Sequence, residues 1–113
     1  MDVRTDYDSA IEIYREWLVE GRDAVDLLNT VDKKLFDLAH HLAIAHRNLA
    51  ENRAELHSLF AWRGERNRQN IARSSEAIEA LLSVRDELFD LRFHVLKRIE
   101  TLGQLQRVTA AAY

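Results

Sequence analysis

The chain contains no cysteine, no proline and only three glycines among its 113 residues. Without cysteine it has no disulfide, no thiolate ligand for zinc or iron and no cysteine nucleophile. Proline and glycine are the residues that punctuate strands and irregular loops, and glycine occurs only at Gly21, Gly64 and Gly103. The sequence therefore predicts an almost entirely helical protein.

The charge and hydropathy of the chain exclude further classes of protein. The formal net charge is −3 at pH 7, so the chain as a whole does not attract nucleic acid or an anionic membrane. No apolar run approaches the ~20 residues of a membrane span, and the first ten residues lack the apolar core of a signal peptide. We expect one helical domain over residues 1–113, located in the cytoplasm and without membrane contact.

Apolar side chains recur at steps of three and four residues in three separate runs, which places each run on one face of a helix. In the third run one heptad series passes through Leu88 and Val95 and a second through Phe89 and Leu96. Such a face is too broad for one neighbouring helix. The predicted fold class is all-α, an elongated antiparallel three-helix bundle. Its expected helices cover residues 6–28, 31–62 and 68–108.

The first turn of this bundle is expected at residues 29–31, where Asn29, Thr30 and Asp32 offer capping side chains. Gly21 falls on the apolar stripe of the expected first helix, and we interpret it as a point of close approach between helices. If the turn does not form, the alternative is a long two-helix hairpin that dimerises into a four-helix bundle.

The layout resembles a spectrin repeat, a three-helix coiled-coil module. Tyr7 is followed ten residues later by Trp17 in "YREWLVEGRDAV", as in the first helix of that family. Phe89 in "IEALLSVRDELFDLRFHVLKR" stands where the family has a second tryptophan packed near the first, and Ile78 precedes it by eleven residues. The resemblance implies a spacer or scaffold with protein partners and no catalysis.

The stretch "WRG" at 62–64 resembles the Trp-x-Gly turn of the small secreted WXG proteins, whose helical hairpins pair as dimers. This chain departs from that family because sixty-one residues precede the motif instead of about forty. The small residues expected after the motif are replaced by "ERNRQN". The main interpretation of this segment is a solvated turn that closes one end of the bundle.

Arginines near this turn give it a possible second role. Trp62, Arg63, Arg66 and Arg68 form a basic tip with an aromatic side chain, a composition that suits either protein docking or phosphate contact. Farther along, Arg85 and Arg92 interrupt an otherwise apolar seam. Arginines at such positions either extend along the edge of the core or pair with carboxylates of a neighbouring helix or subunit.

The residues offer little support for catalysis or metal binding. Asp37 with His40 or His41 has the i,i+3 and i,i+4 spacing that lets two ligands share a helix face, but no di-iron or hemerythrin-like pattern accompanies it. No glycine-rich phosphate loop or nucleophile motif occurs. We therefore expect histidines that flank the core, no metal or other cofactor, and no enzyme activity.

Together these observations favour a non-catalytic structural or protein-interaction module that self-associates, with protein partners and most simply a second copy of itself. The alternative function is that of a small bacterial or phage nucleic-acid-associated factor, which would use the arginine-rich turn at 63–73.

Overall fold

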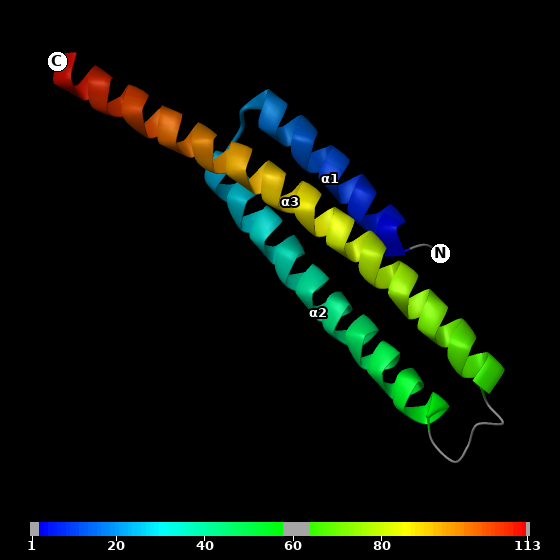
Figure 1. The fold of residues 1–113 in the computed structure, drawn as a ribbon. Helices are drawn as coiled ribbons and strands as arrows, with labels where there is room; N and C mark the ends of the chain where they lie inside the picture. Colours follow the sequence, from blue (N-terminus) through cyan, green and yellow to red (C-terminus); the bar gives the residue numbers. More distant parts are fainter. Residues whose placement is uncertain (1–2, 58–63, 113) are drawn as a thin grey trace.

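The computed structural model describes residues 3–57 and 64–112, and it consists of three helices. These are α1 (Val3–Glu20), α2 (Ala24–Leu56) and α3 (Gly64–Ala112). The described residues contain no strand. The predicted all-α, elongated three-helix architecture is confirmed, with principal extents of 77 × 22 × 15 Å (Figure 1).

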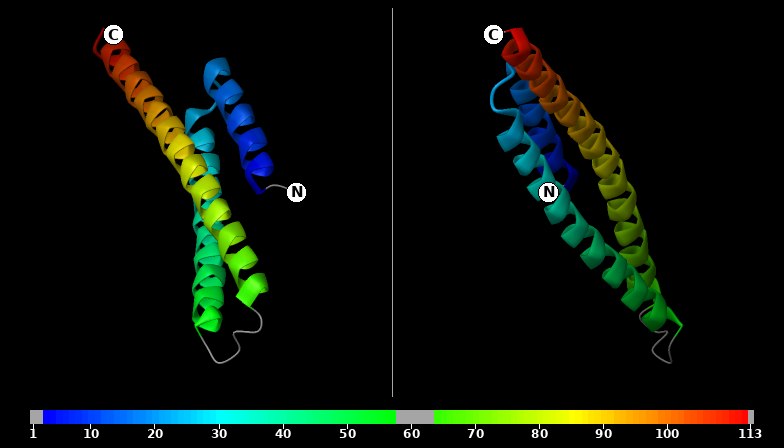
Figure 2. Two further views of the ribbon diagram at one scale, coloured as in Figure 1. Left: turned by 45° about the vertical axis from the view of Figure 1, so that its right-hand side comes forward. Right: turned by 90° about the vertical axis from the view of Figure 1, so that its left-hand side faces the viewer.

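The helices differ greatly in length. α2 and α3 form a long antiparallel hairpin, and α1 lies beside only the half of it that is remote from the 58–63 connection (Figures 1 and 2). The C-terminal part of α3 continues past the turn that joins α1 to α2 (Figure 1). A core of ten buried side chains fills the three-helix half: Tyr7, Ile11, Leu27, Val31, Leu38, Leu81, Val84, Leu88, Leu91 and Val95.

The turn predicted at residues 29–31 is wrong, because the chain turns at residues 21–23 instead. Gly21 ends α1 with φ +72°, and its N–H donates to the carbonyls of Trp17 and Leu18. Asp23 then caps α2 by accepting a hydrogen bond from the N–H of Asp26. Gly21 is therefore a helix terminator, which the spacing of the apolar stripe concealed.

The residues expected to form that turn lie inside α2. The hydroxyl of Thr30 donates to the carbonyl of Asp26 one turn earlier, which satisfies its polar group without breaking the helix. The other boundaries also shift. α2 ends at Leu56 and α3 begins at Gly64, four residues before the expected start, and continues to Ala112. The expected second helix end at residue 62 lies outside the described residues.

Substitution of Gly21 by alanine tests the turn. A Cβ at φ +72° is strained, so Gly21→Ala should lower the free energy of unfolding by about 1–2 kcal/mol. Gly103→Ala is the matched control, since nothing lies within 4 Å of its added Cβ and the site is helical. The control should instead gain about 0.5–1 kcal/mol. Urea unfolding followed by circular dichroism measures both; equal effects would contradict the assignment.

Candidate interaction surface

The structure separates the predicted site residues into two groups along α3. Arg66 and Arg68 lie in its first two turns, whereas Arg85 and Arg92 lie in its middle. At 1.5 Å per residue, Arg68 and Arg85 are about 25 Å apart along the helix. Trp62 and Arg63 lie outside the described residues. The two groups therefore belong to different surfaces.

Carboxylates accompany the arginines at the tip. The guanidinium of Arg68 lies 3.9 Å from the carboxylate of Glu65. Arg66 shares a small polar pocket of about 190 Å³ with Glu55, which comes from the end of α2. Glu55 comes beside Arg66 only when α2 and α3 pack together, so the sequence alone indicated a more basic tip. The described part of the tip is thus less basic than the sequence indicates.

Three asparagines form a polar layer between α2 and α3 in the same pocket. The Oδ1 atom of Asn52 accepts hydrogen bonds from the Nδ2 atoms of Asn67 (3.1 Å) and Asn70 (3.2 Å). The Nδ2 of Asn52 donates to the carbonyl of Asn48. Asn67 is only 3% exposed, and its Oδ1 accepts no hydrogen bond from the described residues. A buried polar layer of this kind fixes the register of two helices.

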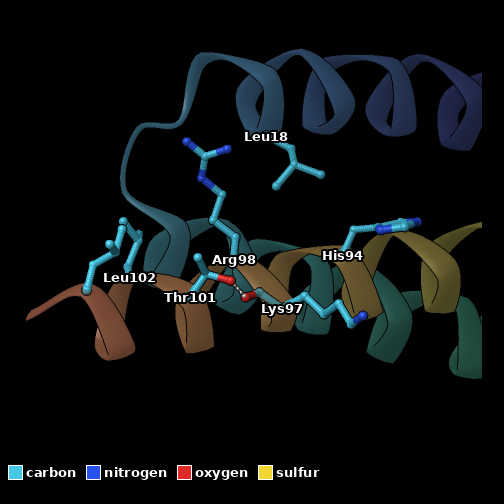
Figure 3. A pocket seen from close by; sticks show the side chains of 7 residues that line it. Leu18, His94, Lys97, Arg98, Thr101 and Leu102 are labelled. Atoms are coloured by element: carbon cyan, nitrogen blue, oxygen red, sulfur yellow. Dashed lines mark hydrogen bonds between the residues drawn. The ribbon is translucent and has the colours of Figure 1, made fainter. Parts of the chain in front are cut away.

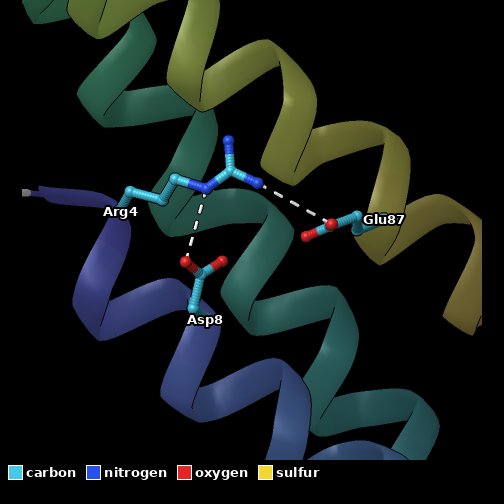
Figure 4. A network of polar contacts seen from close by, with 3 residues as sticks. All are labelled: Arg4, Asp8 and Glu87. Atoms are coloured by element: carbon cyan, nitrogen blue, oxygen red, sulfur yellow. Dashed lines mark hydrogen bonds and ion pairs between the residues drawn. The ribbon is translucent and has the colours of Figure 1, made fainter.

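Polar contacts attach α1 to one side of the α2/α3 hairpin. Arg4 donates to Asp8 on its own helix (3.3 Å) and lies 3.8 Å from the carboxylate of Glu87 on α3 (Figure 4). The hydroxyl of Tyr7 is hydrogen-bonded to Nδ1 of His41 on α2. These contacts show that Glu87 and His41 mark the side of the hairpin that faces α1.

Charged and polar side chains surround the ring of Tyr7, and they include Asp37 and His41, which the sequence spacing places on one helix face. The ammonium of Lys34 lies 5.6 Å from the centroid of its ring. Burial, followed by the nearby charges of Asp37 and Asp6, raises the pKa of the Tyr7 phenol above its ordinary value. Asp37 and His41 therefore surround a docked aromatic side chain. Within residues 3–57 and 64–112, no group of three or more histidine and acidic side chains is placed to hold a metal ion.

Exposed phenylalanines occupy the opposite side of the hairpin. Phe36 and Phe89 each follow by two positions a residue that faces α1, namely Lys34 and Glu87. Two residues turn a helix by about 200°, so both rings point away from α1. Phe36 is 78% exposed and Phe89 is 52% exposed, which agrees with this direction. Trp17, by contrast, packs against the core, so the two aromatics that the spectrin resemblance would pair lie apart.

An interhelical ion pair lies among these phenylalanines. The Nε of Arg92 donates to Oδ1 of Asp32 on α2 at 2.7 Å. Phe36 follows Asp32 by one turn and Phe89 precedes Arg92 by one turn. Because α2 and α3 are antiparallel, both rings lie on the same side of the ion pair. By the same spacing, Leu28 and Leu96 lie on its other side.

We call this surface the phenylalanine face. It consists of a stripe on each helix of the hairpin, on the side away from α1: Asp32, Phe36 and Ala39 on α2, and Arg85, Phe89, Arg92, Phe93 and Leu96 on α3. Phe93 lies at its edge, one turn beyond Phe89, and is 55% exposed. The partly buried Leu28, Leu35, Ile78 and Leu82 lie where this stripe meets the core. Of the two arrangements that the sequence left open for Arg92, the structure shows the pairing with a carboxylate of a neighbouring helix, within one chain.

A second surface feature is a groove of about 460 Å³ between the end of α1 and the projecting part of α3. In Figure 3, Leu18 points from α1 into the gap between Arg98 and His94. Arg98 reaches the turn, where a Cβ added to Gly21 would overlap its guanidinium. The described residues that line the groove include no carboxylate, so they supply no carboxylate partner for acid–base catalysis. They are Leu18, His94, Lys97, Arg98, Thr101, Leu102 and Leu105.

Comparisons with known proteins give no family assignment: no family model, no curated protein and no solved structure matches the chain. In the part of the chain that the structure describes, no helix is long and apolar enough to cross a membrane. The function is therefore inferred from the surface of the described residues.

The raised pKa of Tyr7 predicts a pH dependence of stability. The folded state holds the phenol proton more tightly than the unfolded state, so its contribution is complete below the unfolded pKa of about 10. This contribution to the free energy of unfolding is lost as the pH rises from about 10 through the pKa of Tyr7 in the folded state. Tyr7→Phe should therefore make the free energy of unfolding fall less steeply above about pH 10. Urea titrations at several pH values measure the slope, and equal slopes for the variant and the wild type would refute the prediction.

The asparagine layer predicts unequal costs for two similar substitutions. Asn67→Leu removes a carbonyl that accepts no hydrogen bond from the described residues, while Asn52 keeps Asn70 as a donor, so stability should stay nearly unchanged. Asn52→Leu leaves the buried Nδ2 of Asn67 without an acceptor and should cost about 1–3 kcal/mol. Chemical unfolding at one protein concentration compares them. A larger loss for Asn67→Leu would contradict this account.

Proposed function

We propose that the protein is a cytoplasmic, non-catalytic helical module that self-associates, and that the phenylalanine face packs against the same face of a second copy. The observation that carries this proposal is the gathering of three exposed phenylalanines around an ion pair that joins α2 to α3. Isolated apolar residues are common on protein surfaces, but an aromatic cluster that spans two helices is typical of an interaction site.

The size of the cluster supports a stable contact. A fully buried aromatic side chain removes about 150–250 Å² from water. With the observed exposed fractions, the three phenylalanines expose about 350 Å² between them. A standard interface buries about 800 Å² on each partner, so these rings would supply close to half of it. Leu96 extends the same surface, and the partly buried Leu28 and Leu82 lie at its edge.

The position of α1 is compatible with this association. α1 covers the other side of the hairpin, so two hairpins can meet through their phenylalanine faces with both α1 helices on the outside. The centre of such a dimer is a four-helix arrangement made of two α2/α3 hairpins. Each chain keeps its three-helix fold, and the two α2/α3 hairpins pair into the four-helix arrangement that the sequence offered as its alternative fold.

The elongated shape supports a spacer or scaffold role, the role that the spectrin resemblance implies. The extents of 77 × 22 × 15 Å describe a rod, and a rod that pairs with itself holds other groups at a fixed separation. The departure of Phe89 from the family pattern weakens the family relationship, because this ring is exposed and does not pack near Trp17. The scaffold role therefore rests on shape and on the phenylalanine face.

Nucleic-acid contact through Arg66 and Arg68 is the alternative function. Glu55 beside Arg66 and Glu65 beside Arg68 reduce the positive potential available for phosphate, which weakens the support for it. Charge reversal at both arginines separates the two functions. In the favoured function the change leaves self-association intact, whereas in the alternative it abolishes retention of nucleic acid.

Substitution of the phenylalanines tests the self-association. Wild-type protein should elute with twice the chain mass of 13.2 kDa in size exclusion with light scattering. Phe36→Ser combined with Phe89→Ser should give the chain mass, because the pair contributes a large part of the buried apolar area. Both rings are exposed in one chain, so helicity by circular dichroism should be retained.

Two control variants accompany this test. Ile13→Ser combined with Val19→Ser removes equally exposed apolar side chains from α1 and should leave the mass at twice 13.2 kDa. Arg66→Glu with Arg68→Glu should do the same. A wild-type mass of one chain throughout a dilution series would overturn the proposed function.

A further inference from the structure

Arg85 is a charged residue within the phenylalanine face that has no ion-pair partner among the described residues of its own chain. It lies one turn after Leu82 and one turn before Phe89, so it shares their face of α3. Arg92, one heptad later on the same stripe, has Asp32 as its partner. Arg85 is exposed and makes no ion pair with any described residue. The two arginines that interrupt the same seam thus differ in their surroundings.

The proposed self-association would cover Arg85. Removal of an unpaired guanidinium from water is strongly unfavourable unless a carboxylate accompanies it. Asp32 is already engaged by Arg92, and Asp90 lies 3.7 Å from the imidazole of His94. Asp86 is exposed, adjoins Arg85 and makes no ion pair with the described residues. Asp86 is therefore the available counterion nearest to the centre of the face.

We propose that two copies pack antiparallel, with a twofold axis that passes between Arg85 and Asp86, so that each Arg85 pairs with Asp86 of the partner subunit. This inference rests on the proposed function and specifies its geometry. The two ion pairs are related by symmetry, as an interface between identical surfaces requires. They define one register and one relative orientation of the α3 helices.

Apolar residues on α3 fit this register. With the axis between Arg85 and Asp86, a residue three positions before Arg85 meets one three positions after Asp86. Leu82 then packs against Phe89 of the partner subunit. At seven positions, Ile78 meets Phe93 of the partner subunit. Each exposed ring thus gains an aliphatic neighbour, which suits the packing of aromatic side chains in helical interfaces.

α2 also fits this register. The Asp32–Arg92 ion pair shows which residues of the two helices lie at the same level. The axis lies between six and seven residues before Arg92 on α3. Because the two helices are antiparallel with the same rise per residue, the same level on α2 lies between six and seven residues after Asp32, close to Ala39. Ala39 is exposed and small, so the two α2 helices can approach closely, with Leu35 on one side of it. A parallel pairing would instead place Arg85 against Arg85 of the partner subunit, which is unfavourable.

Charge exchange tests the ion pairs. Arg85→Glu alone and Asp86→Arg alone each create repulsion at both symmetric positions. Each should raise the dimer dissociation constant at least about ten-fold. The double variant Arg85→Glu/Asp86→Arg restores both attractions, and so does an equal mixture of the two single variants. Sedimentation equilibrium of the full chain measures all of these, with Arg15→Glu on α1 as the control that should change nothing.

Cysteine cross-linking tests the orientation, and the absence of native cysteine leaves no competing thiol. Ser75 and Leu96 lie ten positions before Arg85 and after Asp86, so the proposed register brings them together across the interface. Ser75→Cys mixed with Leu96→Cys should form a disulfide-linked dimer on mild oxidation. Each variant alone should not, because its two thiols are about 30 Å apart along the antiparallel helices.

The outcomes separate this inference from the proposed function. Suppose that the wild type dimerises but that the mixture and the double variant dimerise as weakly as the single variants. This result overturns the Arg85–Asp86 pairing and leaves the proposed self-association intact. Cross-linking of Leu96→Cys with itself overturns the antiparallel orientation in the same way. A monomeric wild type overturns both proposals. Restoration together with the mixed disulfide supports the proposed register.

Discussion

The short length of α1 is the constraint on which the rest of the molecule depends. With 18 residues it spans about 27 Å, whereas the 33 residues of α2 span about 50 Å. α1 therefore completes a three-helix core along only part of the hairpin and on only one of its sides. The remaining surface of α2 and α3 must either be polar or be covered by something else, and the chain uses both solutions.

The polar solution appears between α2 and α3, in the part of the hairpin beyond the end of α1. There Asn52, Asn67 and Asn70 hold α2 to α3 by side-chain hydrogen bonds in place of apolar contact. Beside the three-helix half, the side of the hairpin away from α1 instead keeps Phe36, Phe89 and Phe93 exposed. A hairpin that needed no further partner would gain solubility from polar residues there as well. This difference between a polar end and an apolar flank is the physical basis for assigning an interaction to the flank.

Much of the fold follows from the sequence because helical periodicity is local. The third apolar run has a face too broad for one neighbour, and the structure divides that face into a buried part with Leu88 and Val95 and an exposed part with Phe89 and Leu96. The first turn could not be placed in the same way. Asn29 and Thr30 carry capping signals, whereas the position of Gly21 on the apolar stripe indicates a point of close approach. The left-handed conformations that Gly21 and Asp23 adopt place the turn at residues 21–23.

The candidate surface was only partly predictable, for a related reason. Arg85 and Arg92 have the same residue type on the same heptad seam, and periodicity treats them alike. Their difference depends on the alignment of α2 with α3, which brings Asp32 to Arg92 and, among residues 3–57 and 64–112, brings no ion-pair partner to Arg85. Alignment between helices is a property of the folded hairpin, fixed in part by the asparagine layer some distance away. The contacts that distinguish a paired arginine from an unpaired one are therefore set by tertiary register, which local sequence patterns do not encode.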